Sequence, residues 1–166
     1  AFQVASIITT TGYSTVDFNQ WPEFSKTLLL GIMFIGACAG STGGGMKVSR
    51  VMIAFKEIKK ELASVIHPRS VKVIKYEGKV LGHPVLRSLN AYLILYALIF
   101  AVSVLLVSLD NFDFATSFSA VAANFNNIGP GLSTVGPSSN FSMLSDLSKL
   151  VLIFDMLAGR LELFPI

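Results

Sequence analysis

Residues 9 to 16 read Thr-Thr-Thr-Gly-Tyr-Ser-Thr-Val, and the expected fold follows from this stretch. Three hydroxyl residues come directly before a glycine and an aromatic residue. The segment in front of them, residues 1 to 8, is short, uncharged and mostly apolar. A glycine-bearing turn behind a half-length apolar helix is one way in which membrane proteins present backbone carbonyl groups to an ion. The stretch therefore predicts one segment of an ion filter.

A second copy of this pattern lies in the other half of the chain. Residues 126 to 135 read Asn-Asn-Ile-Gly-Pro-Gly-Leu-Ser-Thr-Val, and they follow an apolar segment at residues 114 to 125. As a helix, that segment extends about 18 Å, roughly half of the hydrocarbon core, so it must turn back inside the membrane. Each copy reads spanning helix, re-entrant pore helix, filter and spanning helix, although the first lacks its opening helix. The copies share one orientation, as expected of repeats around a pore.

Two alignments of the copies stay open. Matching the Ser-Thr-Val residues pairs Gly12 with Gly131, whereas matching Thr-Thr-Thr-Gly to Asn-Asn-Ile-Gly pairs Gly12 with Gly129. The second is favoured because it keeps an ungapped approach from the pore helix. Glycine matters here because it adopts backbone angles that other residues avoid, which lets successive carbonyl groups point at an ion. The residues expected to bind the ion are Thr10, Thr11, Gly12, Tyr13, Asn127, Ile128, Gly129 and Gly131.

The composition favours a bilayer environment. The chain of 166 residues is 52% hydrophobic and only 14% charged, whereas a soluble domain is usually about 25% charged. Residues 88 to 109 carry no charge over 22 positions, which is long enough to span a membrane. The alternative, a buried helix of a large soluble protein, needs fewer uncharged residues than this. The sequence therefore predicts an all-α membrane protein.

The charges are unevenly distributed along the chain. Ten of the 13 basic residues lie between Lys47 and Arg87 with only three acids, so this block carries a net charge of +7. By the positive-inside rule the block is expected in the cytoplasm, and the two filter turns on the opposite side. The remainder of the chain is net negative, which would concentrate cations at the outer mouth. A nucleic-acid partner is not expected, since a lysine-rich block alone does not predict one.

The helix that follows the first filter cannot continue unbroken. Residues 36 to 45 contain five glycines, and each costs about 1 kcal/mol in a helix interior. Broken backbone at membrane depth is tolerated only beside protein or water, so an intramembrane loop lining the ion path is expected. A phosphate-binding loop starting at Gly40 is the rival interpretation. It requires lysine where Met46 stands, and no strand precedes it.

The chain is therefore expected to divide into three parts. Residues 1–46 form the end of one pore repeat, with its pore helix, filter and broken inner helix. Residues 47–87 form a cytoplasmic linker, with a basic helix and a small hairpin around Glu77-Gly78. Residues 88–166 form a second pore repeat. The chain opens and closes inside apolar segments, so it is expected to belong to a longer polypeptide.

Four motifs in this order carry a resemblance to a known family. They are Ile-Thr-Thr-Thr-Gly-Tyr-Ser-Thr at 8–15, Gly-Ala-Cys-Ala-Gly-Ser-Thr-Gly-Gly-Gly-Met-Lys at 36–47, Asn-Asn-Ile-Gly-Pro-Gly at 126–131 and Met-Leu-Ala-Gly-Arg-Leu-Glu-Leu-Phe-Pro at 156–165. Together they resemble the TrkH-type membrane subunits of the Trk/Ktr/HKT potassium transporters. The resemblance covers essentially the whole chain, as repeats three and four of such a protein. It implies a channel-like pore of four non-identical repeats around a pseudo-fourfold axis.

The resemblance also implies a function and partners. The expected function is potassium uptake through a gated pore, with K+ as the transported ion, in a multi-pass protein of the inner cell membrane rather than an enzyme. The family implies a homodimer and a cytoplasmic nucleotide-binding regulatory ring subunit of the TrkA type. The expected K+ ligands are Thr10, Thr11, Asn127 and Ile128. The expected gate residues are Gly43, Gly44, Gly45 and Arg160.

Arg160 also stands out without the resemblance. A charge at the centre of a bilayer costs about 2.5–3.5 kcal/mol, so it should face the pore or a partner. The alternative is an arginine near the helix end that pairs with Asp155 or Glu162. Two rival functions remain. One is Na+- or H+-coupled potassium symport, for which Asp155 is the one candidate proton carrier, and the other is a nucleotide-binding or scaffold protein that uses the basic block.

Overall fold

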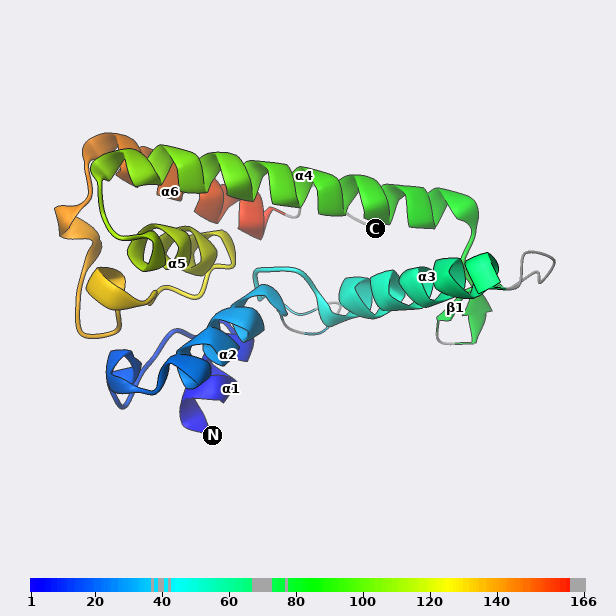
Figure 1. Cartoon of the computed structure of the whole chain (residues 1–166), viewed down its shortest axis with the longest axis horizontal. Coiled ribbons are helices and arrows are strands. Elements are labelled where there is room, and N and C mark those ends of the chain that lie inside the picture. The colour runs from blue at the N-terminus through cyan, green and yellow to red at the C-terminus, as the bar shows by residue number, and fades with distance from the viewer. Residues whose placement is uncertain (37, 39–40, 42, 67–72, 77, 162–166) are drawn as a thin grey trace.

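The computed structural model describes residues 1–36, 38, 41, 43–66, 73–76 and 78–161. The chain is mostly helical, in agreement with the predicted class. Figure 1 shows α4, α5 and α6 together, with α1 and α2 beside them and α3 extending away toward the hairpin. The elements are α1 Phe2–Ile8, η1 Phe18–Gln20, α2 Glu23–Phe34, α3 Val48–Ile66, β1 Lys75–Tyr76, β2 Lys79–Val80, α4 His83–Val107, η2 Ser108–Asp110, α5 Phe114–Phe125, η3 Ser133–Val135, η4 Phe141–Met143 and α6 Asp146–Arg160.

Helix α4 is the longest element, and its ends have clear local causes. Pro84 lies in the first turn, where its missing N–H costs nothing, so the helix begins before the uncharged stretch does. The 3-10 turn η2 continues it to Asp110, and Asn111 ends it with a left-handed φ of 57°. Among the described residues, His83–Asp110 is the one helix long and apolar enough to cross a membrane. Only 22% of its most apolar window is buried, unlike a core helix of a soluble protein.

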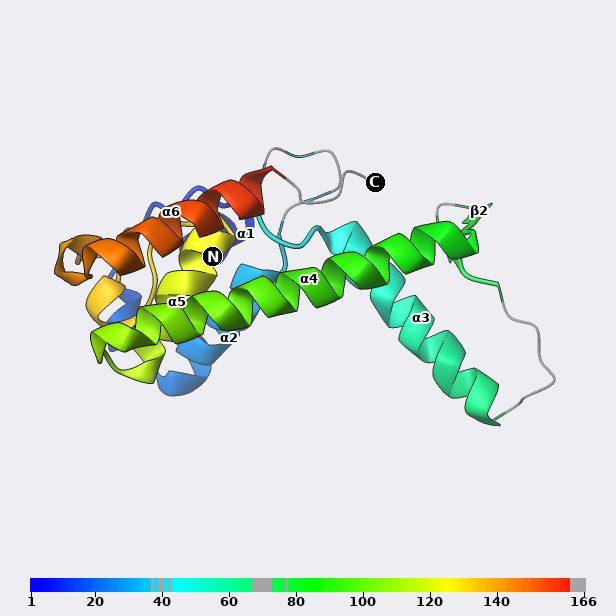
Figure 2. The same ribbon diagram turned by 90° about the horizontal axis from the view of Figure 1, so that it is seen from above.

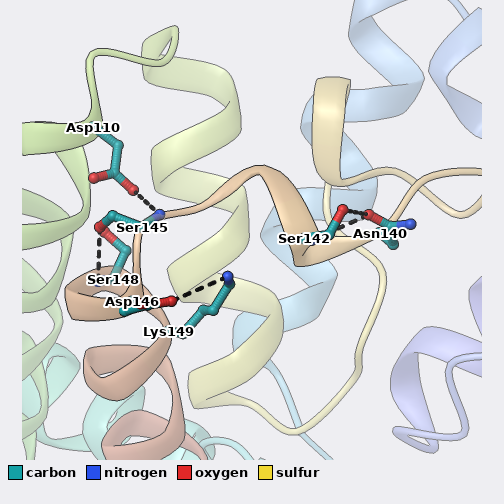
Figure 3. Close-up of polar contacts among 7 residues, drawn as sticks. All are labelled: Asp110, Asn140, Ser142, Ser145, Asp146, Ser148 and Lys149. Atoms are coloured by element: carbon teal, nitrogen blue, oxygen red, sulfur yellow. Dashed lines mark hydrogen bonds and ion pairs between the residues drawn. The ribbon is translucent and has the colours of Figure 1, made fainter.

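Polar contacts join the C-terminal end of α4 to the N-terminal end of α6. The backbone N–H of Ser145 donates to the Asp110 carboxylate at 2.9 Å. Ser145 also caps α6, since its hydroxyl accepts from the backbone N–H of Ser148 at 3.2 Å. Figure 3 shows both contacts, together with the Lys149–Asp146 pair at 3.5 Å one turn along. These contacts fix where α6 starts, so that it runs back along α4 and α5.

The predicted break follows α2. The helix ends at Phe34, before the glycine-rich stretch begins. Ile35 and Met46 then form an isolated parallel bridge, and the Gly36 N–H donates to the Met46 carbonyl at 2.8 Å. The chain thus leaves the helix and returns to almost the same place before α3 begins. We call the described residues from Gly36 to Met46 the glycine loop.

The basic linker contains the expected helix and a shortened hairpin. Helix α3 spans Val48–Ile66, and β1 and β2 pair antiparallel with Lys75 opposite Val80. Gly78 supplies the turn with a φ of 79°. Residue 77, in the turn of the predicted hairpin, lies outside the described residues. Seen from above, α3 diverges from α4 along its length (Figure 2).

Two packed clusters join the two repeats. One is a buried core of Ile7, Phe18, Leu29, Met33, Ile128 and Leu132, which combines residues from both filter regions. The other is aromatic: the Phe34 ring lies 5.3 Å from Phe100 and 6.1 Å from Phe118, measured between centroids. Because α2, α4 and α5 each supply one of these rings, the second cluster fixes the inner helix of one repeat against the other repeat.

Candidate functional site

The two predicted filter turns have the same backbone conformation. Helix α1 ends at Ile8, and Thr10 and Gly12 follow with φ angles of 54° and 77°. Helix α5 ends at Phe125, and Asn127 and Gly129 follow with φ angles of 55° and 105°. In both copies the second and fourth residues after the pore helix are left-handed. Thr10 and Asn127 are as far apart in the sequence as Gly12 and Gly129 are.

The backbone hydrogen bonds repeat with the same spacing. The N–H groups of Thr11 and Gly12 donate to the Ser6 carbonyl at 2.9 and 3.4 Å. Those of Ile128 and Gly129 donate to the Ala123 carbonyl at 2.8 and 3.4 Å. The geometry therefore pairs Gly12 with Gly129, the alignment that the sequence favoured.

Gly131 has a different environment from Gly12. Its N–H donates to the Val135 carbonyl at 2.8 Å, and a Cβ atom on it would lie 2.8 Å from the Val135 side chain and 3.1 Å from the Ser119 hydroxyl. It lies in the segment that leaves the turn, packed against α5. The alignment on Ser-Thr-Val, which pairs Gly12 with Gly131, therefore does not pair residues in equivalent structural positions.

Six carbonyl groups on these turns accept no hydrogen bond from any residue that the structure describes. The N–H groups of the turn residues donate to backbone carbonyls of α1 and α5. The carbonyl groups of the same turn residues take no part in these hydrogen bonds. Within the described part of the chain, no N–H or O–H group donates to any of the six. The six belong to Thr10, Thr11, Gly12, Asn127, Ile128 and Gly129.

The Tyr13 carbonyl differs, because it accepts the Ser6 hydroxyl at 2.6 Å. The expected role of Tyr13 as an ion ligand stays a prediction.

Buried polar side chains on the pore helices hold the segments that leave the turns. Gln3, 4% exposed, donates its amide to the Val16 carbonyl at 2.9 Å. On α5, the Ser119 hydroxyl accepts from the Leu132 N–H at 2.8 Å. Neither Gln3 nor Ser119 was among the residues predicted for the site. A glutamine and a serine on a short apolar helix were the available signal, since buried polar groups need partners.

The two repeats touch at the turns and again at the outer surface. A Cβ atom on Gly12 would lie 2.1 Å from the Ile128 carbonyl oxygen, so the turns are in direct contact. Farther out, the Asn19 amide donates to the Ser133 carbonyl at 3.0 Å and accepts from its N–H at 2.9 Å. This paired contact resembles one step of a β-ladder and fixes the outer loops together.

The glycine loop lies against the second turn. A Cβ atom on Gly44 would lie 2.6 Å from the Asn126 backbone oxygen, and one on Gly45 would lie 2.8 Å from the Asn126 side-chain oxygen. Gly36 is equally crowded, by the Gly44 carbonyl at 2.5 Å. The glycines thus permit a backbone approach that any side chain would prevent. The N–H of Gly43, the remaining predicted gate glycine, donates to the Ser41 hydroxyl at 3.4 Å.

Arg160 ends α6 next to the second turn. The preceding residue, Gly159, lies so close to the turn that a Cβ atom would be 1.8 Å from the Phe125 carbonyl oxygen. One turn earlier, the Met156 carbonyl accepts the Asn127 side-chain amide at 3.2 Å. These contacts place the C-terminal end of α6, which includes Arg160, next to the second turn.

Asp155 is not the partner of Arg160. It is fully buried, and its carboxylate accepts the hydroxyl of Ser103 on α4 at 2.6 Å. The sequence suggested Asp155 or Glu162 as a partner of Arg160, and the first of these is wrong because the Asp155 carboxylate faces α4. Glu162 lies outside the described residues.

A family model described as TrkH, cation transport protein, matches residues 1–166. The chain belongs to the TrkH family. The Trk system potassium uptake protein TrkH of Escherichia coli K12 is 42% identical over 165 residues, which cover 99% of this chain and 34% of that protein. The TrkH protein of Vibrio parahaemolyticus is 45% identical, with the same coverage. The predicted resemblance is thereby confirmed, and the relatives are transport proteins rather than enzymes.

A solved structure agrees with this membership. The crystal structure of the potassium transporter TrkH from Vibrio parahaemolyticus is similar with a TM-score of 0.88 and 44% identity, and it covers 98% of this chain and 34% of that chain. The chain thus spans about a third of the length of its TrkH relatives. Family membership identifies it as part of a membrane protein.

The described residues offer no conventional metal site. No three His, Cys, Asp or Glu side chains gather among the residues that the structure describes.

Proposed function

We propose that the full-length protein takes up potassium ions through a gated pore, and that this chain supplies two of its four filter segments. The observation that carries the proposal is the pair of equivalent turns, whose six carbonyl groups accept no hydrogen bond from the described part of the chain. The names of the TrkH relatives, which describe potassium uptake, support the choice of ion.

The chemistry of the filter follows from these carbonyls. A ring of backbone oxygens replaces the water around a dehydrated potassium ion. The carbonyl ends of α1 and α5 add partial negative charge on the same side. The K+ ligands are Thr10, Thr11 and Gly12 in one segment and Asn127, Ile128 and Gly129 in the other. The Tyr13 carbonyl, which accepts the Ser6 hydroxyl, and Gly131, which lies close to Ser119, flank these ligands.

The gate in this proposal consists of the glycine loop and Arg160. The loop lies against the inner side of the second turn, where it would obstruct an ion leaving the filter. A fixed positive charge beside that path adds an electrostatic barrier to cations. Movement of the loop, with its glycines free of side chains, would open the path.

The cellular setting follows from family resemblance and charge. The basic block that contains α3 faces the cytoplasm, in a multi-pass protein of the inner membrane. The full-length protein forms a homodimer and binds a nucleotide-dependent ring subunit of the TrkA type. These features rest on the resemblance to Trk system proteins rather than on contacts within this chain.

Ion-replacement flux tests the proposal. The full-length protein is reconstituted into liposomes, and uptake of potassium, rubidium and sodium is measured under the same electrical driving force. Uptake of potassium and rubidium should exceed that of sodium. Equal sodium and potassium uptake would contradict potassium selectivity.

Proton-coupled symport is a second candidate, and Asp155 is the observation that favours it. A fully buried carboxyl group inside a membrane helix is uncommon and often functional. In that case a proton gradient should drive potassium uptake, and Asp155→Asn should abolish the effect. Potassium flux that follows only the potassium gradient and the voltage would favour the channel-like pore.

A further inference from the structure

Asn126 occupies the point where the second pore helix, the filter turn and the glycine loop meet. It is the first residue after α5 and is fully buried. Its side-chain NH2 group donates to the Ala122 carbonyl of α5 at 2.8 Å. Its side-chain oxygen faces Gly45, where a Cβ atom would come within 2.8 Å of it. One amide group therefore contacts the pore helix on one side and the glycine loop on the other.

Tyr96 fixes the orientation of this amide from α4. Its hydroxyl donates to the Asn126 side-chain oxygen at 2.7 Å, in a contact buried on both sides. An asparagine amide can in principle turn over, which exchanges its donor and acceptor ends. Here the reverse orientation would set an oxygen against the Ala122 carbonyl and an NH2 group against crowded Gly45. The tyrosine hydroxyl supplies the donor that keeps the oxygen in its observed place.

The Tyr96 ring is held independently of its hydroxyl. It packs edge-on against Phe125 at 4.7 Å between centroids, and it lies 6.0 Å from the ring of Tyr92. The guanidinium of Arg50, on α3, lies 4.3 Å from the centre of the Tyr92 ring. The ring would therefore keep its place if the hydroxyl alone were removed. This separation makes the hydrogen bond testable apart from the packing.

We infer that Tyr96 is a positioning residue whose hydroxyl holds Asn126 and so sets the spacing between the second filter turn and the glycine loop. The residue touches no ion. It acts through Asn126, whose backbone oxygen adjoins Gly44 and whose neighbour Asn127 is a proposed ion ligand. The expected effect of Tyr96 on ion selectivity rests on the proposed function, whereas its expected effect on the glycine loop does not.

Two readouts on the full-length protein test this inference, with Tyr96→Phe as the variant and Tyr92→Phe as the matched control. The control makes the same change one helical turn away and keeps the ring under Arg50. Loss of one buried hydrogen bond should lower the potassium-to-sodium uptake ratio about two- to tenfold in the Tyr96 variant. Amide hydrogen exchange should rise in the glycine loop and in residues 126–129, while exchange elsewhere stays at the wild-type level.

Each outcome separates the inference from the proposed function. Wild-type uptake without potassium preference would contradict the proposed function, and the exchange measurement would still decide the role of Tyr96. Unchanged exchange and an unchanged ion ratio in Tyr96→Phe would overturn the inference. The same would follow if Tyr92→Phe had an equal effect, because the cause would then be general packing. A double variant with Asn126→Ala should add little to the effect of Asn126→Ala alone, and full additivity would also overturn it.

Discussion

The carbonyl oxygen of Ile128 lies 2.1 Å from the point that a Cβ atom on Gly12 would occupy. This contact joins the filter turns of two repeats that are far apart in sequence. Gly12 is thus constrained twice, by its φ of 77° and by the space that Ile128 takes. The two turns therefore support one another, and neither can change shape without displacing the other.

This contact makes Gly12 and Gly129 a natural pair for mutation. Both have positive φ, so alanine at either position costs about 1–2 kcal/mol in backbone strain. Only Gly12 is crowded, since nothing lies within 4 Å of a Cβ atom on Gly129. Gly12→Ala should therefore reduce potassium uptake more than Gly129→Ala in the same liposome assay. An equal reduction would show that strain, rather than contact between the turns, controls the filter.

The glycine loop should be sensitive to a single added carbon. Gly44→Ala would place a methyl group 2.6 Å from the Asn126 carbonyl, so the loop should no longer seat against the turn. Because the loop is the proposed gate, basal potassium flux should rise. Gly31→Ala, in α2 with nothing within 4 Å, is the control and should leave flux unchanged. A fall in flux in the Gly44 variant would contradict a gating role.

Removal of the Arg160 charge should also raise basal flux. Arg160→Ala takes away the positive charge at the inner end of α6, and with it the electrostatic barrier to cations. Lys149→Ala removes a positive charge from the same helix near its start, where Lys149 pairs with Asp146, and should have little effect. The measurement is basal potassium flux through the reconstituted full-length protein. Unchanged flux in both variants would exclude Arg160 from the gate.

Asn19 should contribute to stability through its paired contact with Ser133. Asn19→Ala loses both hydrogen bonds, each worth about 0.5–1.5 kcal/mol, and leaves a backbone donor of Ser133 unpaired. The free energy of unfolding should fall by about 1–3 kcal/mol. Asn140 is the control, because among the described residues its side chain hydrogen-bonds to Ser142 of its own turn and to no residue of the other repeat. A thermal-stability comparison that ranks Asn140→Ala equal to Asn19→Ala would contradict the role of the inter-repeat contact.

Much of the architecture could be predicted because the relevant signals are local. The apolar segment at residues 114 to 125 predicted a helix of that length, and α5 has these bounds, Phe114–Phe125. Glycine density predicted that the helix after the first filter would break. Its end at Phe34 escaped prediction, because the Ile35–Met46 bridge that ends it depends on where the chain returns.

In the two turns, identical residues in the sequence do not occupy equivalent positions in the structure. Val16 and Val135 follow identical Ser-Thr pairs, yet the two copies match at Gly12 and Gly129. The second copy has two more residues before its Ser-Thr-Val, and Ser133 takes a left-handed φ of 57° to start η3. The spacing from the pore helix predicted the pairing correctly, because the helix end fixes the turn that follows.

The contacts that tune the site could not be predicted. Asn19 meets Ser133 across 114 residues, and Tyr96 meets Asn126 across 30. Neither pair follows a helix or strand period, and each residue alone is an ordinary polar side chain in a loop or a helix. Their partners depend on how the repeats pack, which no local pattern encodes.

The most direct test of the filter assignment is the position of a heavy potassium analogue in a crystal of the full-length protein. Rubidium or thallium should give anomalous peaks beside the carbonyl groups of Thr10 to Gly12 and of Asn127 to Gly129. The peaks should diminish when sodium replaces the heavier ion. An analogue bound elsewhere, for example between Asp155 and Ser103, with no peak beside these six carbonyls, would contradict the account.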